Sequence, residues 1–512
     1  MRSSSAATTG HTAEDPFDMS RDDLESIIGL LRSSETKSLG ISEVEELLST
    51  RTRELMCKLL QAHIDSRGPG EAAAPVRGAD EVERDRPRLH ERELATLFGS
   101  VRVRRLGYRA DGVDSLHPLD AELNLPQESY SFALRRRAAE EAAKVSFDET
   151  VASLAKQTGT AVPKRQVEEL VVRAAQDFDA FYDQRPPPEA KSADILVISA
   201  DGKGVVMRRE DLREGTKKKA TTRRRKLTQR LTRGEKKNAK RMATVAAVYT
   251  VEPYVRTPDQ VAHALAGQTH PEAPPRPRPE NKQVWASLEK PADQVLAQAF
   301  AQAQSRDLGH KKAWVALVDG NDEQLQTLQR LAAAHGVDLT IILDIIHVCE
   351  YVWKASLCFH AETDPDREAW VEERVLRILQ GQSSLVAAGM TRSATMRGLT
   401  NRKAVDACAR YLINHTPYLR YDRHLAAGMP IATGVIEGAC RYLLKDRMDI
   451  TGARWRLKAA EAVLRLRALR KNGDFDEYWR FHEQREYERN HSSRYAGGSV
   501  VPIRGRHLKR TK

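Results

Sequence analysis

Three predicted strands each end in an aspartate, and one predicted helix carries a glutamate near its start. These acidic residues are Asp201, Asp319, Asp344 and Glu437. Mg²⁺ and Mn²⁺ are hard cations that prefer oxygen ligands, and carboxylates can bridge two such ions about 4 Å apart. One ion of such a pair activates an attacking water or hydroxyl, and the other stabilises the leaving oxygen. The residue types therefore predict a phosphoryl-transfer site that binds two Mg²⁺ or Mn²⁺ ions.

The segment Asp194–Met207 places the first of these carboxylates. An apolar, β-branched run leads to Asp201, Gly202 and Gly204 follow, and a second apolar run closes the segment. The pattern predicts a strand that ends at Asp201, a tight turn through the glycines, and a partner strand. Asp-Gly pairs are also common in hairpin turns that bind nothing, which is the alternative interpretation of Asp201.

The order of the predicted elements favours a particular α/β fold. Later strands are predicted at Ala243–Thr250, Ala313–Asp319 and Leu339–Asp344. Three strands followed by alternating helices and strands is the order of an RNase H-like mixed sheet, in which the first and fourth strands are neighbours. Asp201 would end the first strand and Asp319 the fourth, so their side chains would meet at one edge. Glu437, from the last helix, would complete the triad.

The composition indicates a globular protein with a polyanionic partner. The 512 residues carry a net charge of +12, with a pI of about 9.4, which favours nucleic acid. No run of about 18 apolar residues occurs, so no membrane partner is expected, and we expect a cytoplasmic, nucleoid-associated protein. The five cysteines form no Cys-x-x-Cys pair, which argues against disulfides and a structural zinc site.

A helix-turn-helix outline follows the N-terminal region. Ser146, with Glu149 three residues later, predicts a capped helix start, and Gly159 lies in the break that follows. A second helix would begin with Lys164 and Arg165, which could contact DNA. A plain helical hairpin is the alternative.

The densest charge run lies between residues 208 and 241, next to Asp201. A cationic loop beside an acidic site is expected where the substrate is a phosphodiester backbone. Its candidate DNA-binding residues are Lys217, Lys218, Lys219, Arg223, Arg224, Arg225 and Lys226.

These patterns divide the chain into seven predicted segments. They are a disordered tail (1–20), an N-terminal helical region with a short basic strand (21–110), a helical DNA-binding region (111–190), the first part of the RNase H-like core (191–365), a helical insertion (366–430), the last part of the core with the glutamate helix (431–490), and a basic disordered tail (491–512).

Four motifs in this order resemble the bacterial insertion-sequence DDE transposases of the Mutator-like group, in particular the ISKra family. The motifs are Asp201-Gly-Lys-Gly204, Val318-Asp-Gly-Asn321, Leu343-Asp-Ile-Ile-His347 and Gly434-Val-Ile-Glu-Gly-Ala-Cys-Arg441. The resemblance covers roughly residues 40 to 485. It implies Asp201, Asp319 and Glu437 as metal ligands and catalytic residues, transposon-end and target DNA as partners, and a homodimer or larger synaptic assembly.

Several assignments remain open within this resemblance. The family has a Cys/Asp-x-x-His signature after the strand that follows the second aspartate, which Asp344 and His347 fit; they are a supporting pair or, in the case of Asp344, the alternative ligand. Arg441 and Lys445 are candidate phosphate contacts, and Trp455 either stacks on an unpaired base or belongs to the core. An RNase H-like nuclease without strand transfer, and an inactive DNA-binding relative, are the alternative functions.

Overall fold

The computed structural model describes residues 15–189, 194–221, 239–268, 275–450 and 452–504. The chain divides into two compact units. Unit 1 combines Met1–Phe181 with Asp476–Lys512, and unit 2 is Tyr182–Phe475. The helices α8 (Phe178–Gln184) and α22 (Phe475–Asn490) run across the two division points. Within the described ranges, no helix combines the length and apolar character that a membrane span requires.

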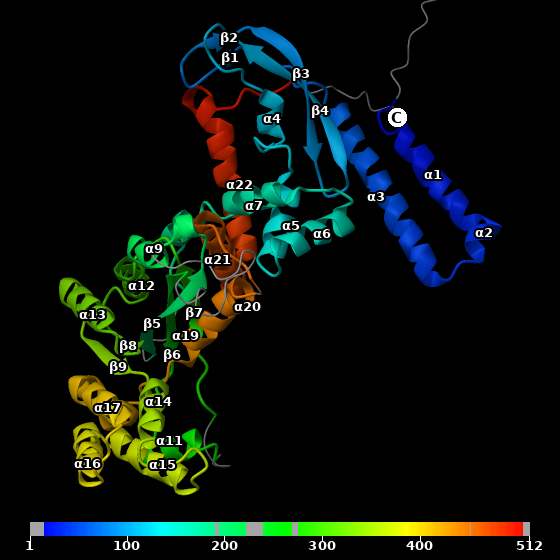
Figure 1. The fold of residues 1–512 in the computed structure, drawn as a ribbon. Helices are drawn as coiled ribbons and strands as arrows, with labels where there is room; N and C mark the ends of the chain where they lie inside the picture. The colour runs from blue at the N-terminus through cyan, green and yellow to red at the C-terminus, as the bar shows by residue number, and fades with distance from the viewer. Residues whose placement is uncertain (1–14, 190–193, 222–238, 269–274, 451, 505–512) are drawn as a thin grey trace, which may run out of the picture. The chain divides into compact units, whose positions relative to one another are not determined.

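Unit 2 is an α/β structure built on a five-stranded mixed sheet (Figure 1). The strands, in spatial order, are β7 (Glu280–Ser287), β6 (Lys240–Val251), β5 (Ile195–Val206), β8 (Trp314–Val318) and β9 (Leu339–Leu343). β5, β6 and β7 pair antiparallel, whereas β8 runs parallel to both β5 and β9. All five residues of β8 are buried, as expected for a strand covered on both faces. The predicted adjacency of the first and fourth strands, β5 and β8, is confirmed.

The predicted turn after Asp201 is wrong. β5 continues through Gly202 and Gly204 and pairs with β6 over its whole length, with Asp201 opposite Val245. A Cβ atom on Gly204 would lie 2.8 Å from the Lys240 side chain. The glycine therefore gives the long side chains of β6 room beside an extended strand, instead of forming a turn.

The third strand is consequently not the one that the sequence predicts. The second apolar run of Asp194–Met207 belongs to β5 itself, and the third strand is β7. The first half of β7 reads Glu-Asn-Lys-Gln, so it lacks the apolar alternation by which a strand is recognised.

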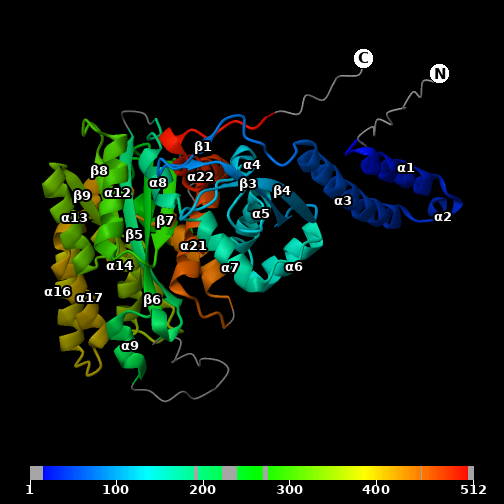
Figure 2. The same ribbon diagram turned by 90° about the horizontal axis from the view of Figure 1, so that it is seen from above.

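The helices of unit 2 pack on the sheet and on one another. α12 (Ala292–Arg306) contacts β5 and β6, and α21 (Leu457–Asn472) contacts β7. The remaining helices before the glutamate helix are α9 (Glu214–Thr221), α11 (Pro258–Leu265), α13 (Asp322–His335), α14 (Ile345–Ser356), α15 (Asp366–Leu379), α16 (Ser383–Met396), α17 (Lys403–Asn414) and α18 (Tyr421–Ala426). The strand-free helical segment predicted before Glu437 is confirmed as α15 to α18, and α16 and α17 lie side by side in both views (Figures 1 and 2).

Unit 1 begins with helices and continues with two hairpins. Its elements are α1 (Asp18–Arg32), α2 (Ser34–Lys37), α3 (Ile41–Ser66), β1 (Val76–Arg77), β2 (Glu83–Arg84), β3 (Arg86–Ala95), β4 (Ser100–Arg109), α4 (Pro118–Glu122), α5 (Phe132–Ala142), α6 (Phe147–Thr158) and α7 (Lys164–Ala174). The basic strand predicted at residues 101–108 is confirmed as β4. Its partner β3 was not predicted, because its sequence is mostly polar and lacks the alternating apolar residues by which a strand is recognised.

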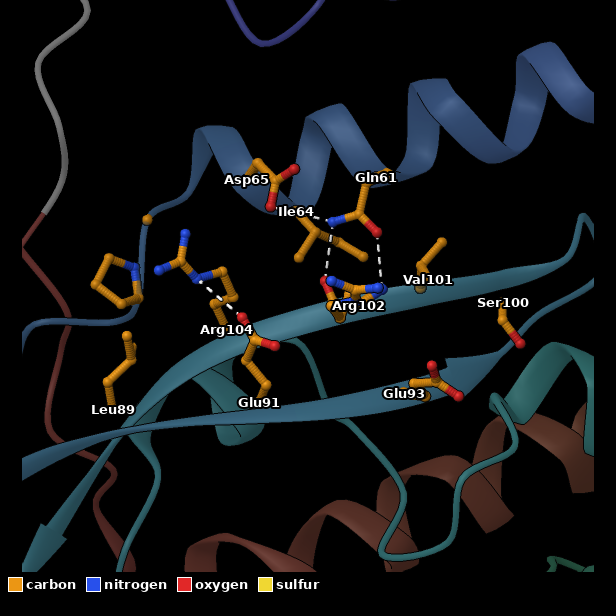
Figure 3. Close-up of a pocket in the computed structure, with 12 residues that line it drawn as sticks. Gln61, Ile64, Asp65, Leu89, Glu91, Glu93, Ser100, Val101, Arg102 and Arg104 are labelled. Carbon is orange, nitrogen blue, oxygen red and sulfur yellow. Dashed lines mark hydrogen bonds and ion pairs between the residues drawn. The ribbon is translucent and has the colours of Figure 1, made fainter.

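The long helix α3 lies against β4 and completes the strand's free edge (Figure 3). The Gln61 amide donates to the carbonyl of Arg102 at 2.9 Å and accepts from the Arg102 N–H at 2.7 Å. A side-chain amide thus takes the place of a neighbouring strand, so these edge groups are not left unpaired. The groove beside this contact holds both acidic and basic side chains, including the ion pair of Glu91 with Arg104.

The predicted helix–turn–helix outline is present as α6, a turn and α7, which pack with α5. Ser146 and Glu149 form the predicted capping box, and Gly159 ends α6 in the left-handed conformation at φ 68°. The local pattern therefore forms as predicted, while its use in DNA binding stays a prediction.

The predicted disordered tail is wrong for residues 491–504, because they pack on unit 1. Tyr495 is buried with Val76 and Tyr108, and Ile503 packs against the core that contains Ile64. Backbone bridges join Ala72 to Ile503 and Gly78 to Tyr495. Residues 1–14 and 505–512 of the predicted tails lie outside the described residues, and the first tail is already helical from Asp18.

Candidate active site

The register of β5 and β8 brings two of the predicted carboxylates to the same level of the sheet, where β8 ends. Ser199 pairs with Leu317, and its hydroxyl donates to the Leu317 carbonyl at 2.8 Å. Asp201 and Asp319 each lie two residues beyond that pair in parallel strands. Both residues are partly exposed.

The backbone after β8 is shaped around Asp319. Gly320 adopts a φ of 89°, and a Cβ atom there would lie 3.1 Å from the Tyr411 hydroxyl. That hydroxyl donates to the Asp319 carbonyl at 3.0 Å, and the Asn321 N–H donates to Asp319 Oδ1 at 3.2 Å. One carboxylate oxygen of Asp319 thus has a fixed backbone donor, which orients the side chain at the start of α13.

Glu437 lies on α19 (Gly434–Ala439), which packs against β5 and β6. Partial burial raises the pKa of its carboxyl, and the negative charges of Asp344, Asp201 and Glu350 raise it further. Glu437 therefore shares one electrostatic environment with the carboxylates of β5 and β9. Because crowded carboxylates repel one another, such a cluster favours cation binding.

Cys440 ties the glutamate helix to Asp201. Its thiol donates to Asp201 Oδ2 at 3.2 Å, and burial together with the Asp201 charge raises the pKa of the thiol. The thiol therefore stays protonated and acts as a hydrogen-bond donor. Cys440 also begins a π-helical turn, Cys440–Lys445, that continues α19.

Asp344 is a structural cap. It is 4% exposed, and it accepts from the Thr433 hydroxyl at 2.6 Å, from the Thr433 N–H at 3.3 Å and from the Ile346 N–H at 3.1 Å. It therefore begins α14 and fixes the residue that precedes α19. These three donors leave the buried carboxylate about one of its roughly four lone-pair sites, which favours Asp319 as the second ligand.

His347 belongs to an aromatic group beneath the site. Its ring lies 5.3 Å from that of Tyr351 and 5.9 Å from that of Tyr411, and these tyrosines stack at 4.3 Å. Among the described residues no hydrogen bond joins His347 to Asp344, so the predicted pair is close in sequence but not directly bonded. Tyr411 and Thr433 stand in no sequence motif, and only their contacts with Asp319 and Asp344 reveal their roles at the site.

The candidate DNA-binding residues fall in several places. Lys164 and Arg165 are exposed on the first turn of α7, where they pair with Asp148 and Glu169. Lys218 on α9 is exposed and Lys217 is partly so, while the side chain of Lys219 and residues Arg223, Arg224, Arg225 and Lys226 lie outside the described part of the structure. Arg441 and Lys445 are exposed on the π-helical turn that follows Glu437.

The base-stacking role considered for Trp455 is wrong. Its indole is 5% exposed, its Nε1 donates to the Met448 carbonyl at 3.1 Å, and the Arg447 guanidinium covers the ring. Its backbone pairs with Val206 and Arg208, so Trp455 fastens its segment to the end of β5. Core packing places the ring out of reach of a base.

The donor set fits a hard divalent cation in its chemistry, because Asp201, Asp319 and Glu437 all supply carboxylate oxygens. The three side chains are not already arranged around a common point: among the described residues, no three acidic, histidine or cysteine side chains form a group that could hold a metal ion. Asp201 and Glu437 would hold such an ion from β5 and α19, and Asp319 from β8.

The chain matches no protein-family model, and no curated protein matches it.

Proposed function

We propose that the protein is a DDE transposase with an RNase H-like catalytic core. It would cleave DNA at the inverted-repeat ends of a transposon and join the freed strand to target DNA. The observation that carries the proposal is the register of β5 and β8, which puts Asp201 and Asp319 at the same level of two neighbouring strands. The helix α19 also brings Glu437 into the electrostatic field of Asp201. The strand order β7-β6-β5-β8-β9, with its antiparallel and parallel pairs, supports the RNase H-like assignment.

Two bound Mg²⁺ or Mn²⁺ ions would supply activation of the attacking oxygen and stabilisation of the leaving oxygen. Asp201, Asp319 and Glu437 would bind them. Asp344 and Cys440 would act as positioning residues, since they fix α19 and the Asp201 carboxylate by hydrogen bonds. In the joining step, one phosphorus–oxygen bond forms while another breaks, so no external energy source is needed.

Exposed cations would hold the DNA. Lys164 and Arg165 on α7 occupy the first turn of the second helix of the helix–turn–helix outline, a position used to read DNA ends. Arg441 and Lys445 follow Glu437 along the same continuous helix and are suited to phosphate contacts. Because two transposon ends must be cut together, the active form would be a homodimer or larger assembly.

The test is strand transfer of a labelled inverted-repeat end in the presence of Mg²⁺ or Mn²⁺. We expect Asp201→Asn, Asp319→Asn and Glu437→Gln each to reduce joining at least about 10²-fold, the size of effect that loss of a preorganised electrostatic group has on catalysis. Binding to the end DNA, measured in EDTA, should persist in all three variants.

Two outcomes would contradict the proposal. Cleavage without any joined product would favour a hydrolytic nuclease, and end binding without cleavage by the wild type would favour a DNA-binding protein. Full activity of Asp319→Asn would show that the second ligand is misassigned.

A further inference from the structure

A pocket of about 450 Å³ lies beside the helix that carries Glu437. Gly434, Val435 and Gly438 of α19 form one wall, and residues near the ends of β6 and β7 form the others. Its size is within the range of sites for small organic ligands. The space next to Gly434 is open, because a Cβ atom at this position would meet no atom within 4 Å.

The charges around this pocket are mostly positive. Arg256, Arg276, Arg278 and Lys282 line it, against one carboxylate, Glu252. Burial, together with the neighbouring charge of Arg276, lowers the pKa of Arg256 to about 10, so the guanidinium remains charged at neutral pH. The Arg256 side chain is held in place by the carbonyls of Met429 and Tyr254, at 2.8 and 3.2 Å. A fixed guanidinium with further cations around it is suited to a phosphate.

Aromatic rings supply the other half of a ligand site. The Arg256 guanidinium lies over the Tyr254 ring at 5.3 Å, and the Lys282 and Lys471 ammonium groups lie 5.9 and 5.1 Å from the Tyr442 ring. The buried Tyr442 hydroxyl has no hydrogen-bond partner among the described residues. Gly428 allows Tyr254 its place, because a Cβ atom at Gly428 would lie 2.7 Å from the Tyr254 nitrogen.

A planar group and an anion together are the recognition units of a nucleotide. We infer that this pocket binds one nucleotide of a single-stranded DNA segment, with its phosphate on Arg256, Arg276 and Arg278 and its base against Tyr254 and Tyr442. Stacking on tyrosine accepts every base, while arginine binds phosphate irrespective of sequence. The pocket would hold an unpaired nucleotide next to the helix of Glu437, and so guide the strand to the carboxylates. The identity of that strand rests on the proposed function, whereas the binding itself does not.

The binding test uses the full chain, a fluorescent short oligothymidylate and EDTA, so that no cleavage is needed. We expect Arg276→Gln/Arg278→Gln to weaken binding about tenfold. The slope of log K against log salt concentration should also become less steep by about 1.4, because each phosphate contact on a single strand contributes about 0.7 to that slope. The matched control is Arg392→Gln/Arg410→Gln, which removes two exposed arginines of α16 and α17 and should bind like wild type.

The base is tested with Tyr254→Leu and with an oligonucleotide that contains abasic sites. Wild type should bind the abasic strand about tenfold more weakly than oligothymidylate, and the Tyr254→Leu variant should lose most of that difference. Melting temperatures within about a degree of wild type would show that the variants are folded. If Tyr254→Leu does not fold, the double arginine variant, which is changed only at exposed side chains, still tests the inference.

Unchanged oligonucleotide affinity in the double arginine variant would overturn the inference. So would binding of thymidine monophosphate without any binding of the oligonucleotide, which would indicate a free-nucleotide site. Failure of the proposed function gives a different result: wild type would join no DNA ends, while the pocket variants would still lose oligonucleotide binding.

Discussion

At the scale of single residues, the structure separates two aspartates that the sequence could not. Asp319 and Asp344 each follow an apolar strand and each precede a helix, so their local patterns are alike. Their partners differ: Asp344 is buried under Thr433, while Asp319 is partly exposed beside β5. The contact between Asp344 and Thr433 spans 89 residues of sequence, which no local pattern reveals.

This difference predicts unequal losses of stability when each aspartate is replaced. Asp344→Ala removes a helix cap and leaves the Thr433 donors unpaired, so we expect a loss of about 2–4 kcal/mol in the free energy of unfolding. Asp319→Ala should cost less than about 1 kcal/mol, because its side chain is partly exposed. Urea unfolding measures both. An Asp344→Ala variant as stable as wild type, yet unable to join DNA, would instead make Asp344 a metal ligand.

At the scale of elements, the glutamate helix depends on a π-helical turn. Such a turn leaves backbone carbonyls displaced from their normal helical partners. The Arg467 guanidinium of α21 satisfies two of them: its Nε donates to the Leu443 carbonyl at 2.9 Å, and it also bonds the Tyr442 carbonyl. Arg467 is 8% exposed, so these bonds are shielded from water.

Arg467→Met should therefore cost about 2–4 kcal/mol of stability, because two buried carbonyls lose their donor. It should also reduce strand joining, since the turn is continuous with α19. Arg470→Met on the same helix removes an exposed arginine and serves as the control. Equal unfolding midpoints for the two variants would argue against a supporting role for Arg467.

Elements with a strong local signal are the ones that sequence analysis predicted correctly. The capping box at Ser146 and the buried runs of β8 and β9 determine their own structure. β3 and the first half of β7 lack that signal, since pairing with a neighbouring strand, not local pattern, makes them strands. The turn predicted at Gly202 and Gly204 was wrong for a related reason. These glycines relieve crowding against β6, and this contact cannot be inferred from the sequence of β5 alone.

At the scale of the whole molecule, unit 1 carries a buried ionic network. Burial alone would raise the pKa of Asp177, but hydrogen bonds and charge interactions with His482 and Arg489 lower it below its ordinary value. Burial likewise opposes a lower pKa for Glu486, but Arg135 lowers it. Burial also lowers the pKa of His117, to about 3, helped by Arg105. Each of these groups has a lower pKa in the folded chain than its ordinary pKa. Its contribution to stability is therefore fully present above the ordinary pKa and is lost as the pH falls towards the folded-state pKa.

Unit 1 should therefore lose stability in two stages as the pH falls. The histidine contribution declines below about 6.5, and the carboxylate contribution declines below about 4. Hydrogen exchange at graded pH, corrected for intrinsic rates, measures protection in peptides of unit 1. His117→Asn should flatten the decline between about pH 6.5 and 4 and leave the later one intact. Identical profiles for the variant and wild type would refute the histidine contribution.

Unit 1 is assembled from both ends of the sequence, and this has a consequence for synthesis. A ribosome makes residues 1–181 first, but Tyr495 and Ile503, which fill the cores of that unit, emerge only after all of unit 2. Unit 2 can fold while translation continues, whereas the first unit must wait for its last segment. A prematurely terminated chain would then carry the carboxylates of β5 and β8 without a completed first unit. Synthesis of residues 476–504 would thus decide when the helix–turn–helix unit reaches its finished form.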